Sequence, residues 1–475
     1  MLFPTLTFAV FFMLVYPIYW FLRERGGVSW KPFILGASYV FYGFWDWRFV
    51  FLIIGSTIVN QWLAVWIDPP GYRLRKPLMA VAVAFNLSLL GLFKYYGFFI
   101  DSFNTGLRRL GLGTRLPVLE IIVPVGISFF TFQAITYVVD IYKGKIKPAS
   151  LLDFAVYLAF FPHLVAGPIV RAAEFIPQLR RPQAVDRQQA SRAAWLIGLG
   201  LFKKVVIASN VATAIVDPVF ALPGQHSAPE TLLAIYGYAV QIYADFSGYT
   251  DIAIGIALLL GITFPQNFDR PYTAASLQEF WRRWHMTLSR WLRDYLYIPL
   301  GGSRKGRGKT YRNLLLTMAL GGLWHGASAT FIAWGLFHGL GLAVERWIGE
   351  RRAARGGDGE ATAAWWVWPG RLLTFNLVCV GWVLFRADSF TTAVAILKQT
   401  VTAWGQPGPL VTRNLVLVIA GALAMQYFPV GLSRRLQAAF AEPPLVVQGA
   451  VMGVVIALIF ALGPKGVAPF IYYQF

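Results

Sequence analysis

Two histidines in apolar, tryptophan-rich stretches are the side chains best suited to chemistry. His325 lies in LGGLWHGA (320–327), and His285 lies in QEFWRRWHMTLSRWLRDYLY (278–297). Imidazole titrates near neutral pH, so a histidine within reach of a hydroxyl can accept and return a proton. Glycines beside His325 let another backbone or a substrate approach closely. This pattern predicts acid–base chemistry, such as a hydroxyl attacking a thioester whose thiolate leaves.

A structural role is the main alternative for each histidine, with both ring nitrogens hydrogen-bonded inside the protein. Ionisable groups inside a membrane are costly and usually mark a pathway or an active site, which favours a functional role for His325 and leaves that of His285 open. His226 falls in a polar loop, and His163 lies beside a proline. His338 follows thirteen residues after His325, which on one helix would place the two side chains on different sides.

Metal and serine-hydrolase chemistry have less support in the sequence. No HExxH spacing occurs, and Asp245 and Asp251 in YADFSGYTDIAIG could join the histidines only through the fold. The GxSxG elbow of a serine hydrolase is absent. Cys379 is the only cysteine, which excludes a zinc–cysteine cluster and an intramolecular disulfide. We therefore expect no metal.

The composition places these residues in a membrane protein. Hydrophobic residues make up 57% of the 475 and charged residues 13%, and the mean hydropathy is +0.56. A soluble domain carries about 25% charged residues. Backbone groups in lipid must be satisfied internally, so we expect one all-α polytopic domain over residues 1–475, with about 11–14 transmembrane or re-entrant helices. The expected segments lie near 3–22, 32–47, 49–67, 77–100, 116–140, 151–170, 192–216, 231–262, 314–345, 365–388, 411–430 and 445–463.

The net charge of +20 fits a membrane protein with basic cytoplasmic loops that meet anionic lipid headgroups. The aromatic residues lie inside apolar runs, so lipids rather than nucleic acid are the expected partners. The loop between the first two segments is expected inside and the N-terminus outside, because that loop carries Arg23, Arg25 and Lys31. The loop at 217–230 has no lysine or arginine and is expected outside, like the stretch around 405–412.

The region 264–313 is the most basic, with ten basic and three acidic residues and a net charge of +7, so it is expected to be cytoplasmic. Helical periodicity predicts a basic amphipathic helix in it. One face carries Trp281, Trp284, Leu288, Trp291, Leu292 and Tyr295, with His285 on that side, pointing inward. The opposite face carries Arg282, Arg283, Arg290 and Arg293. These arginines are expected to bind lipid phosphates or the phosphates of an acyl donor.

Motifs around these residues resemble the membrane-bound O-acyltransferase family, and most of all its bacterial alginate O-acetyltransferase branch. The D-alanyl transfer protein of teichoic acid modification is a more distant likeness. The motifs are FFPHLVAGPIVR (160–171), YADFSGYTDIAIG (243–255), NFDRPY (267–272), EFWRRWHMTLSRWLRDYLYIPLGGSRKG (279–306) and GGLWHGASATFIAWGLFHG (321–339). ASYVFYGFWDWRF (37–49) and GISFFTFQAITYVVDIYKG (126–144) extend the resemblance to roughly residues 1–400.

The resemblance implies that His325 is the family's invariant histidine and His285 its second conserved one. It implies a ring of helices around a central tunnel, fed from the cytoplasm by acetyl-CoA or another acyl thioester. The product would be an O-acetylated extracytoplasmic polysaccharide such as alginate, made through a partner acyltransferase at the bacterial inner membrane. An acyl-carrier-dependent transferase of the D-alanyl type and a non-catalytic transporter or flippase remain open alternatives.

Overall fold

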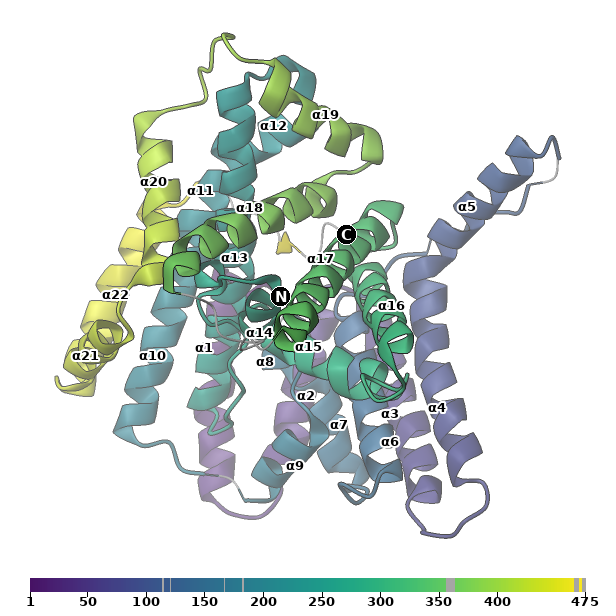
Figure 1. Cartoon of the computed structure of the whole chain (residues 1–475). Helices are drawn as coiled ribbons and strands as arrows, with labels where there is room; N and C mark the ends of the chain where they lie inside the picture. The colour runs from purple at the N-terminus through teal and green to yellow at the C-terminus, as the bar shows by residue number, and fades with distance from the viewer. Residues whose placement is uncertain are drawn as a thin grey trace. The chain divides into compact units, whose positions relative to one another are not determined.

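The computed structural model describes residues 1–112, 115–119, 121–165, 167–181, 183–355, 364–464 and 470–471 (Figure 1). All the regular secondary structure of these residues is helical, and none of them forms a strand. By length and composition, seven described helices could cross a membrane, or eight if the bent pair described below forms one span. The prediction of an all-α polytopic membrane protein is confirmed. The seven are Leu6–Glu24, Arg48–Ile67, Arg75–Arg109, Arg187–Ala221, Ala228–Leu259, Val367–Arg386 and Leu445–Leu462.

The described chain divides into two compact units, of which the first comprises residues 1–193 and 253–265. Lys31 and Arg23, which the topology prediction treated as loop charges, make contacts within this unit. Lys31 Nζ lies 2.6 Å from Asp153 Oδ1, and Arg23 donates to the carbonyl of Leu260. The helices are α1 (Leu6–Glu24), α2 (Trp30–Gly43), α3 (Arg48–Ile67), α4 (Arg75–Leu90), α5 (Tyr96–Arg109), α6 (Ile127–Tyr142), α7 (Leu151–Ala159), α8 (Phe161–Leu164) and α9 (Ala172–Arg180).

The second unit comprises residues 194–252 and 266–475 and contains both predicted catalytic histidines. Its long helix α13 (Ala228–Leu259) and the preceding α10 (Arg187–Leu201) have residues in both units. Two ion pairs tie α13 to the π-helical segment Phe202–Ala208 that continues α10: Lys204 with Asp245, and Lys203 with Asp251 at 2.6 Å. The shorter helices that follow α10 are α11 (Ser209–Val211) and α12 (Asp217–Ala221).

The remaining helices of the second unit carry the site and the end of the chain. They are α14 (Leu277–Arg283), α15 (Met286–Leu292), α16 (Arg307–His325), α17 (Ala329–Ala354), α18 (Val367–Arg386), α19 (Phe390–Thr402), α20 (Arg413–Ala424), α21 (Val430–Ala441) and α22 (Leu445–Leu462). The segment Arg413–Tyr427 and α21 form the bent pair, with 95° between them. The expected span at 411–430 therefore coincides with the first arm of this pair.

The segment 314–345, expected to be one span, is a helical hairpin of α16 and α17, which lie side by side in Figure 1. The expectation of one continuous helix was wrong because the backbone extends at Gly326 and Ser328 starts a new helix, its side chain accepting from Thr330 N–H. A Cβ on Gly322 would lie 2.1 Å from the Phe331 carbonyl oxygen. Glycine thus lets the two helix backbones touch, with His325 at the turn.

Candidate active site

His285 occupies a break in the backbone, not the middle of a helix. Helix α14 ends at Arg283 and α15 begins at Met286, while His285 between them has φ 41°, in the left-handed region. The prediction of one amphipathic helix here was therefore wrong. The prediction that His285 points inward is confirmed, because none of its surface is exposed. A left-handed conformation costs a residue with a Cβ roughly 1–2 kcal/mol, so other contacts must hold it.

Those contacts come from the segment that begins at Asn267. Met286 N–H donates to the Asn267 carbonyl at 2.9 Å, and Asp269 N–H donates to the Arg283 carbonyl at 2.9 Å. The two bonds lie on either side of His285 and join two antiparallel stretches of backbone. They satisfy backbone groups that a continuous helix would have paired internally, which explains why local periodicity failed to predict the break.

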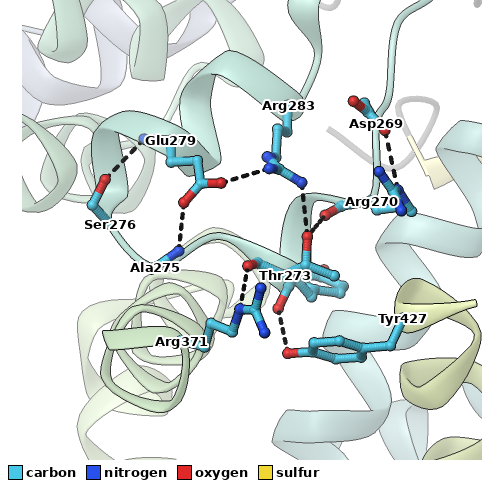
Figure 2. A network of polar contacts seen from close by, with 10 residues as sticks. Asp269, Arg270, Thr273, Ala275, Ser276, Glu279, Arg283, Arg371 and Tyr427 are labelled. Carbon is cyan, nitrogen blue, oxygen red and sulfur yellow. Dashed lines mark hydrogen bonds and ion pairs between the residues drawn. The ribbon is translucent and has the colours of Figure 1, made fainter. Parts of the chain in front are cut away.

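A polar network fixes the chain between Asp269 and α14, as Figure 2 shows. Arg283 donates to Glu279 at 2.5 Å and to the Thr273 hydroxyl at 2.8 Å. Arg371 of α18 donates to the Thr273 carbonyl at 3.0 Å. Ser276 caps α14 by accepting from Glu279 N–H at 3.1 Å. Because of these contacts, the end of the His285 break at α14 is held by side chains as well as by the backbone.

His325 is the last residue of α16 and packs among aromatic rings. It is 3% exposed, and its ring centroid lies 5.0 Å from Trp324, 5.1 Å from Trp334 and 5.3 Å from Phe385. The His285 and His325 ring centroids are 6.5 Å apart, although the residues are separated by forty positions in sequence. The second unit therefore brings the two predicted catalytic histidines together in an interior from which water is largely excluded.

The two imidazoles have different electrostatic surroundings. His285 lies between α14 and α15, neither of which is among the helices long and apolar enough to span a membrane. Burial lowers the pKa of His285 to about 3, so its ring is neutral at physiological pH. His325 lies at a helix C-terminus, where the backbone carbonyls favour a positive charge. A neutral imidazole beside a second one at a helix C-terminus suits the handling of a proton between them.

The other histidines are placed apart from this pair. His338 lies on α17, a different helix from α16, so the premise that it shares a helix with His325 was wrong. Its ring centroid lies 5.1 Å from that of Trp334, which is also 5.1 Å from that of His325. His163, in the first unit, bonds the Tyr157 carbonyl at 2.8 Å. His226 lies 3.5 Å from Glu230.

The four arginines proposed to bind the donor do not share one helical face, because the break at His285 separates them. Arg283 is engaged by Glu279 and Thr273, and Arg293 Nε lies 2.7 Å from Asp294. Arg290 is half-buried on α15. Arg282 is exposed and makes no ion pair within the described part of the chain. Arg282 is thus the arginine of this group that is best placed to meet a phosphate from solution.

Sequence reasoning missed the residues that surround the two imidazoles. Asn267 is part of the NFDRPY motif, and the signal that could have found it is an amide side chain just before a proline-containing turn. Phe246 lies 4.7 Å from His285, edge to face, and was seen only as one aromatic among many. Among the described residues, no three His, Cys, Asp or Glu side chains lie close enough to hold a metal ion.

The described chain is helical, with several helices that could cross a membrane, and its second unit buries two histidines with ring centroids 6.5 Å apart. The chain belongs to the membrane-bound O-acyltransferase family, whose family model matches residues 127–356. It is 41% identical over 426 residues to the probable alginate O-acetylase AlgI of Pseudomonas aeruginosa, covering 88% of this chain and 79% of that protein.

Two further relatives act on different envelope polymers, according to their names. The peptidoglycan O-acetyltransferase of Helicobacter pylori is 38% identical over 399 residues, covering 78% of this chain and 73% of that protein. The teichoic acid D-alanyltransferase of Streptococcus thermophilus is 30% identical over 281 residues, covering 55% and 67%. The chain is therefore a multi-pass membrane O-acyltransferase that acts on a hydroxyl acceptor.

Proposed function

We propose that this protein transfers an acetyl group from a cytoplasmic thioester, acetyl-CoA, to a hydroxyl acceptor beyond the bacterial inner membrane. The acetyl group would end on an extracytoplasmic polysaccharide such as alginate, through an acyltransferase partner on the outer side. The observation that carries the proposal is the buried pair of His285 and His325, whose ring centroids lie 6.5 Å apart. The names of the alginate and peptidoglycan relatives support acetyl as the group transferred.

The reaction needs one proton acceptor and one proton donor. The hydroxyl oxygen attacks the thioester carbonyl carbon as its proton passes to an imidazole, and an oxyanion forms. When the oxyanion collapses, the C–S bond breaks and the thiolate leaves as CoA, taking up a proton. His285 is proposed as the imidazole that accepts the hydroxyl proton, and His325 as the imidazole that supplies a proton to the departing thiolate.

The donor and the reaction class are tested with inverted membrane vesicles from the source bacterium, which retain the native acceptor. Supplying [14C]acetyl-CoA, we expect release of free CoA and label that alkali removes from envelope polymer, both dependent on this protein. Label that appears only from an acyl-loaded carrier protein would instead indicate a transferase of the D-alanyl type. Donor that crosses the membrane with its thioester intact would indicate a transporter.

The region 264–313 is proposed to face the cytoplasm because of its +7 charge. The experiment places one cysteine at the exposed Ser303 after Cys379, which is 2% exposed, is replaced by alanine. We expect Ser303→Cys to react with an impermeant maleimide only after the cells are permeabilised. The matched control Gln225→Cys, exposed in the segment expected outside, should react in intact cells. Labelling of Ser303→Cys in intact cells would refute this topology.

The basic residues around the break are proposed to bind the phosphates of the donor, with Arg282 making the main contact. Replacing Arg282 with alanine should raise the KM for acetyl-CoA roughly 2- to 5-fold, the range of an exposed ion pair. The increase should shrink at high salt, because exposed charges are screened. Arg293→Ala is the matched control, since Asp294 already pairs that guanidinium. Less stable protein with an unchanged KM would show that Arg282 only anchors to lipid.

A further inference from the structure

One carbonyl oxygen in the second unit collects three hydrogen bonds around the His285 break. Asn267 Oδ1 accepts from the backbone N–H of Thr287 at 3.1 Å and from the Thr287 hydroxyl at 2.8 Å. The same oxygen lies 3.1 Å from Nδ1 of His285. Asn267 and His285 are both fully buried. The side chain of Asn267 therefore touches both the ring of His285 and the backbone that follows it.

These contacts decide which ring nitrogen of His285 carries the proton. The Thr287 backbone N–H can only donate, so the Asn267 atom that faces it must be the carbonyl oxygen and not the amide nitrogen. An oxygen in that position can only accept, so His285 Nδ1 must donate to it. The neutral imidazole has a single N–H, which leaves a lone pair on Nε2.

His285 Nε2 is buried and has no hydrogen-bond partner among the residues that the structure describes. A buried acceptor without a donor is unfavourable, and such groups in native proteins call for an explanation. A hydroxyl group that enters between His285 and His325 would supply the missing donor. An oxyanion could not, because it has no proton to give to this lone pair.

We propose that Asn267 is a positioning residue that locks His285 in the tautomer with the proton on Nδ1, so that Nε2 accepts a hydrogen bond from the attacking hydroxyl. This inference deepens the function proposed above and rests on it. It assigns His285 to the hydroxyl acceptor and not to the oxyanion that forms at the thioester carbonyl. The oxyanion must then be stabilised by a different donor.

The rival explanation is that Asn267 only clamps the strained backbone through its carbonyl and through Thr287. The two roles are separated by what replaces Asn267. Asn267→Asp keeps an oxygen that can accept from both His285 and Thr287. Asn267→Leu has nearly the same size and no acceptor. Thr287→Val removes one bond to the same oxygen and leaves the contact with the imidazole, so it is the matched control.

Transfer from [14C]acetyl-CoA is measured in inverted vesicles, per unit of folded protein. We expect Asn267→Leu to lower kcat about 10-fold, the factor by which one hydrogen bond can shift an equilibrium, with the donor KM unchanged. Asn267→Asp should restore most of this loss, and Thr287→Val should cost little. In a His285→Asn background, Asn267→Leu should cause no further loss, because its effect passes through the imidazole. Equal losses in the Asp and Leu variants, or a further loss in that background, would overturn the proposal.

A direct readout of the tautomer does not depend on activity. The full-length protein in lipid, labelled with [15N]histidine, is compared with the His285→Asn variant by solid-state NMR to identify the signals of His285. We expect the proton on Nδ1 in the wild type, and a proton on Nε2 would overturn the assignment even if every variant folds poorly. Full kcat in His285→Asn would instead refute the proposed catalytic role while leaving the tautomer result intact.

Discussion

Replacing His325 with alanine should lower kcat for acyl transfer about 10²–10⁴-fold, the usual contribution of a general acid–base residue. The imidazole lies at the end of α16, with its ring centroid 6.5 Å from that of His285. The loss should appear in kcat because proton transfer accompanies the chemical step. The measurement is CoA release and alkali-labile label per unit of folded protein in inverted vesicles. Thermal unfolding should show that the variant remains folded and inserted.

His338→Ala is the matched control for this variant. His338 is also buried and contacts the same Trp334 ring, but it lies outside the pair of histidines. We expect this variant to lose some stability and to retain kcat per folded molecule. If both variants lost kcat to the same extent, the effect of His325→Ala would reflect damaged aromatic packing and not lost acid–base chemistry.

Replacing His285 with asparagine should lower kcat about 10²-fold, the lower end of the acid–base range. Asparagine is the better substitution because it tolerates the left-handed backbone that His285 adopts at φ 41°, whereas alanine would add strain. The break between α14 and α15 should therefore survive while the imidazole lone pair is lost. The donor KM should change little, since Arg282 and the rest of the basic surface remain.

The stability of His285→Asn separates the two explanations of this effect. We expect its unfolding temperature to lie close to that of the wild type, because the Asn267 backbone contacts do not depend on the imidazole. Wild-type kcat in this variant would leave His285 without a role in transfer. A large fall in unfolding temperature that fully accounts for lost activity would make His285 a structural residue.

The sequence was sufficient to predict the helical membrane fold and to select His285 and His325 as candidates. Apolar runs report the length of a membrane-crossing helix directly, because the bilayer imposes that length. An ionisable ring inside such a run is costly enough to mark a position by itself. The family motifs around FWRRWH and LWHG then supported the same two residues independently.

The breaks in the helices could not be predicted, because their causes are not local. The helix predicted across His285 is interrupted by backbone bonds from Asn267 and Asp269, more than a dozen positions earlier in the chain. Periodicity compares each residue only with neighbours three and four positions away. The turn at Gly326 was missed for a related reason: the apolar pattern continues through it into α17, while the backbone reverses.

Asn267 could not be singled out by residue type, because buried amide side chains occur at many structural positions. In the first unit Asn60 and Asn86 bond each other, with Asn86 Nδ2 2.6 Å from Asn60 Oδ1. Asn267 differs from these two in that its Oδ1 lies 3.1 Å from Nδ1 of the titratable His285. That contact is created by the fold, so it becomes visible only in three dimensions.

Vesicle sidedness combined with the His325 variant tests the proposed transfer most directly. Sealed inverted and sealed right-side-out vesicles receive the same membrane-impermeant [14C]acetyl-CoA, with wild-type protein or His325→Ala. We expect alkali-labile label on envelope polymer in inverted wild-type vesicles only, since the donor is taken from the cytoplasmic face and transfer needs the imidazole of His325. Equal labelling in both orientations, or labelling by His325→Ala at the wild-type rate, would contradict transfer from a cytoplasmic thioester through this site.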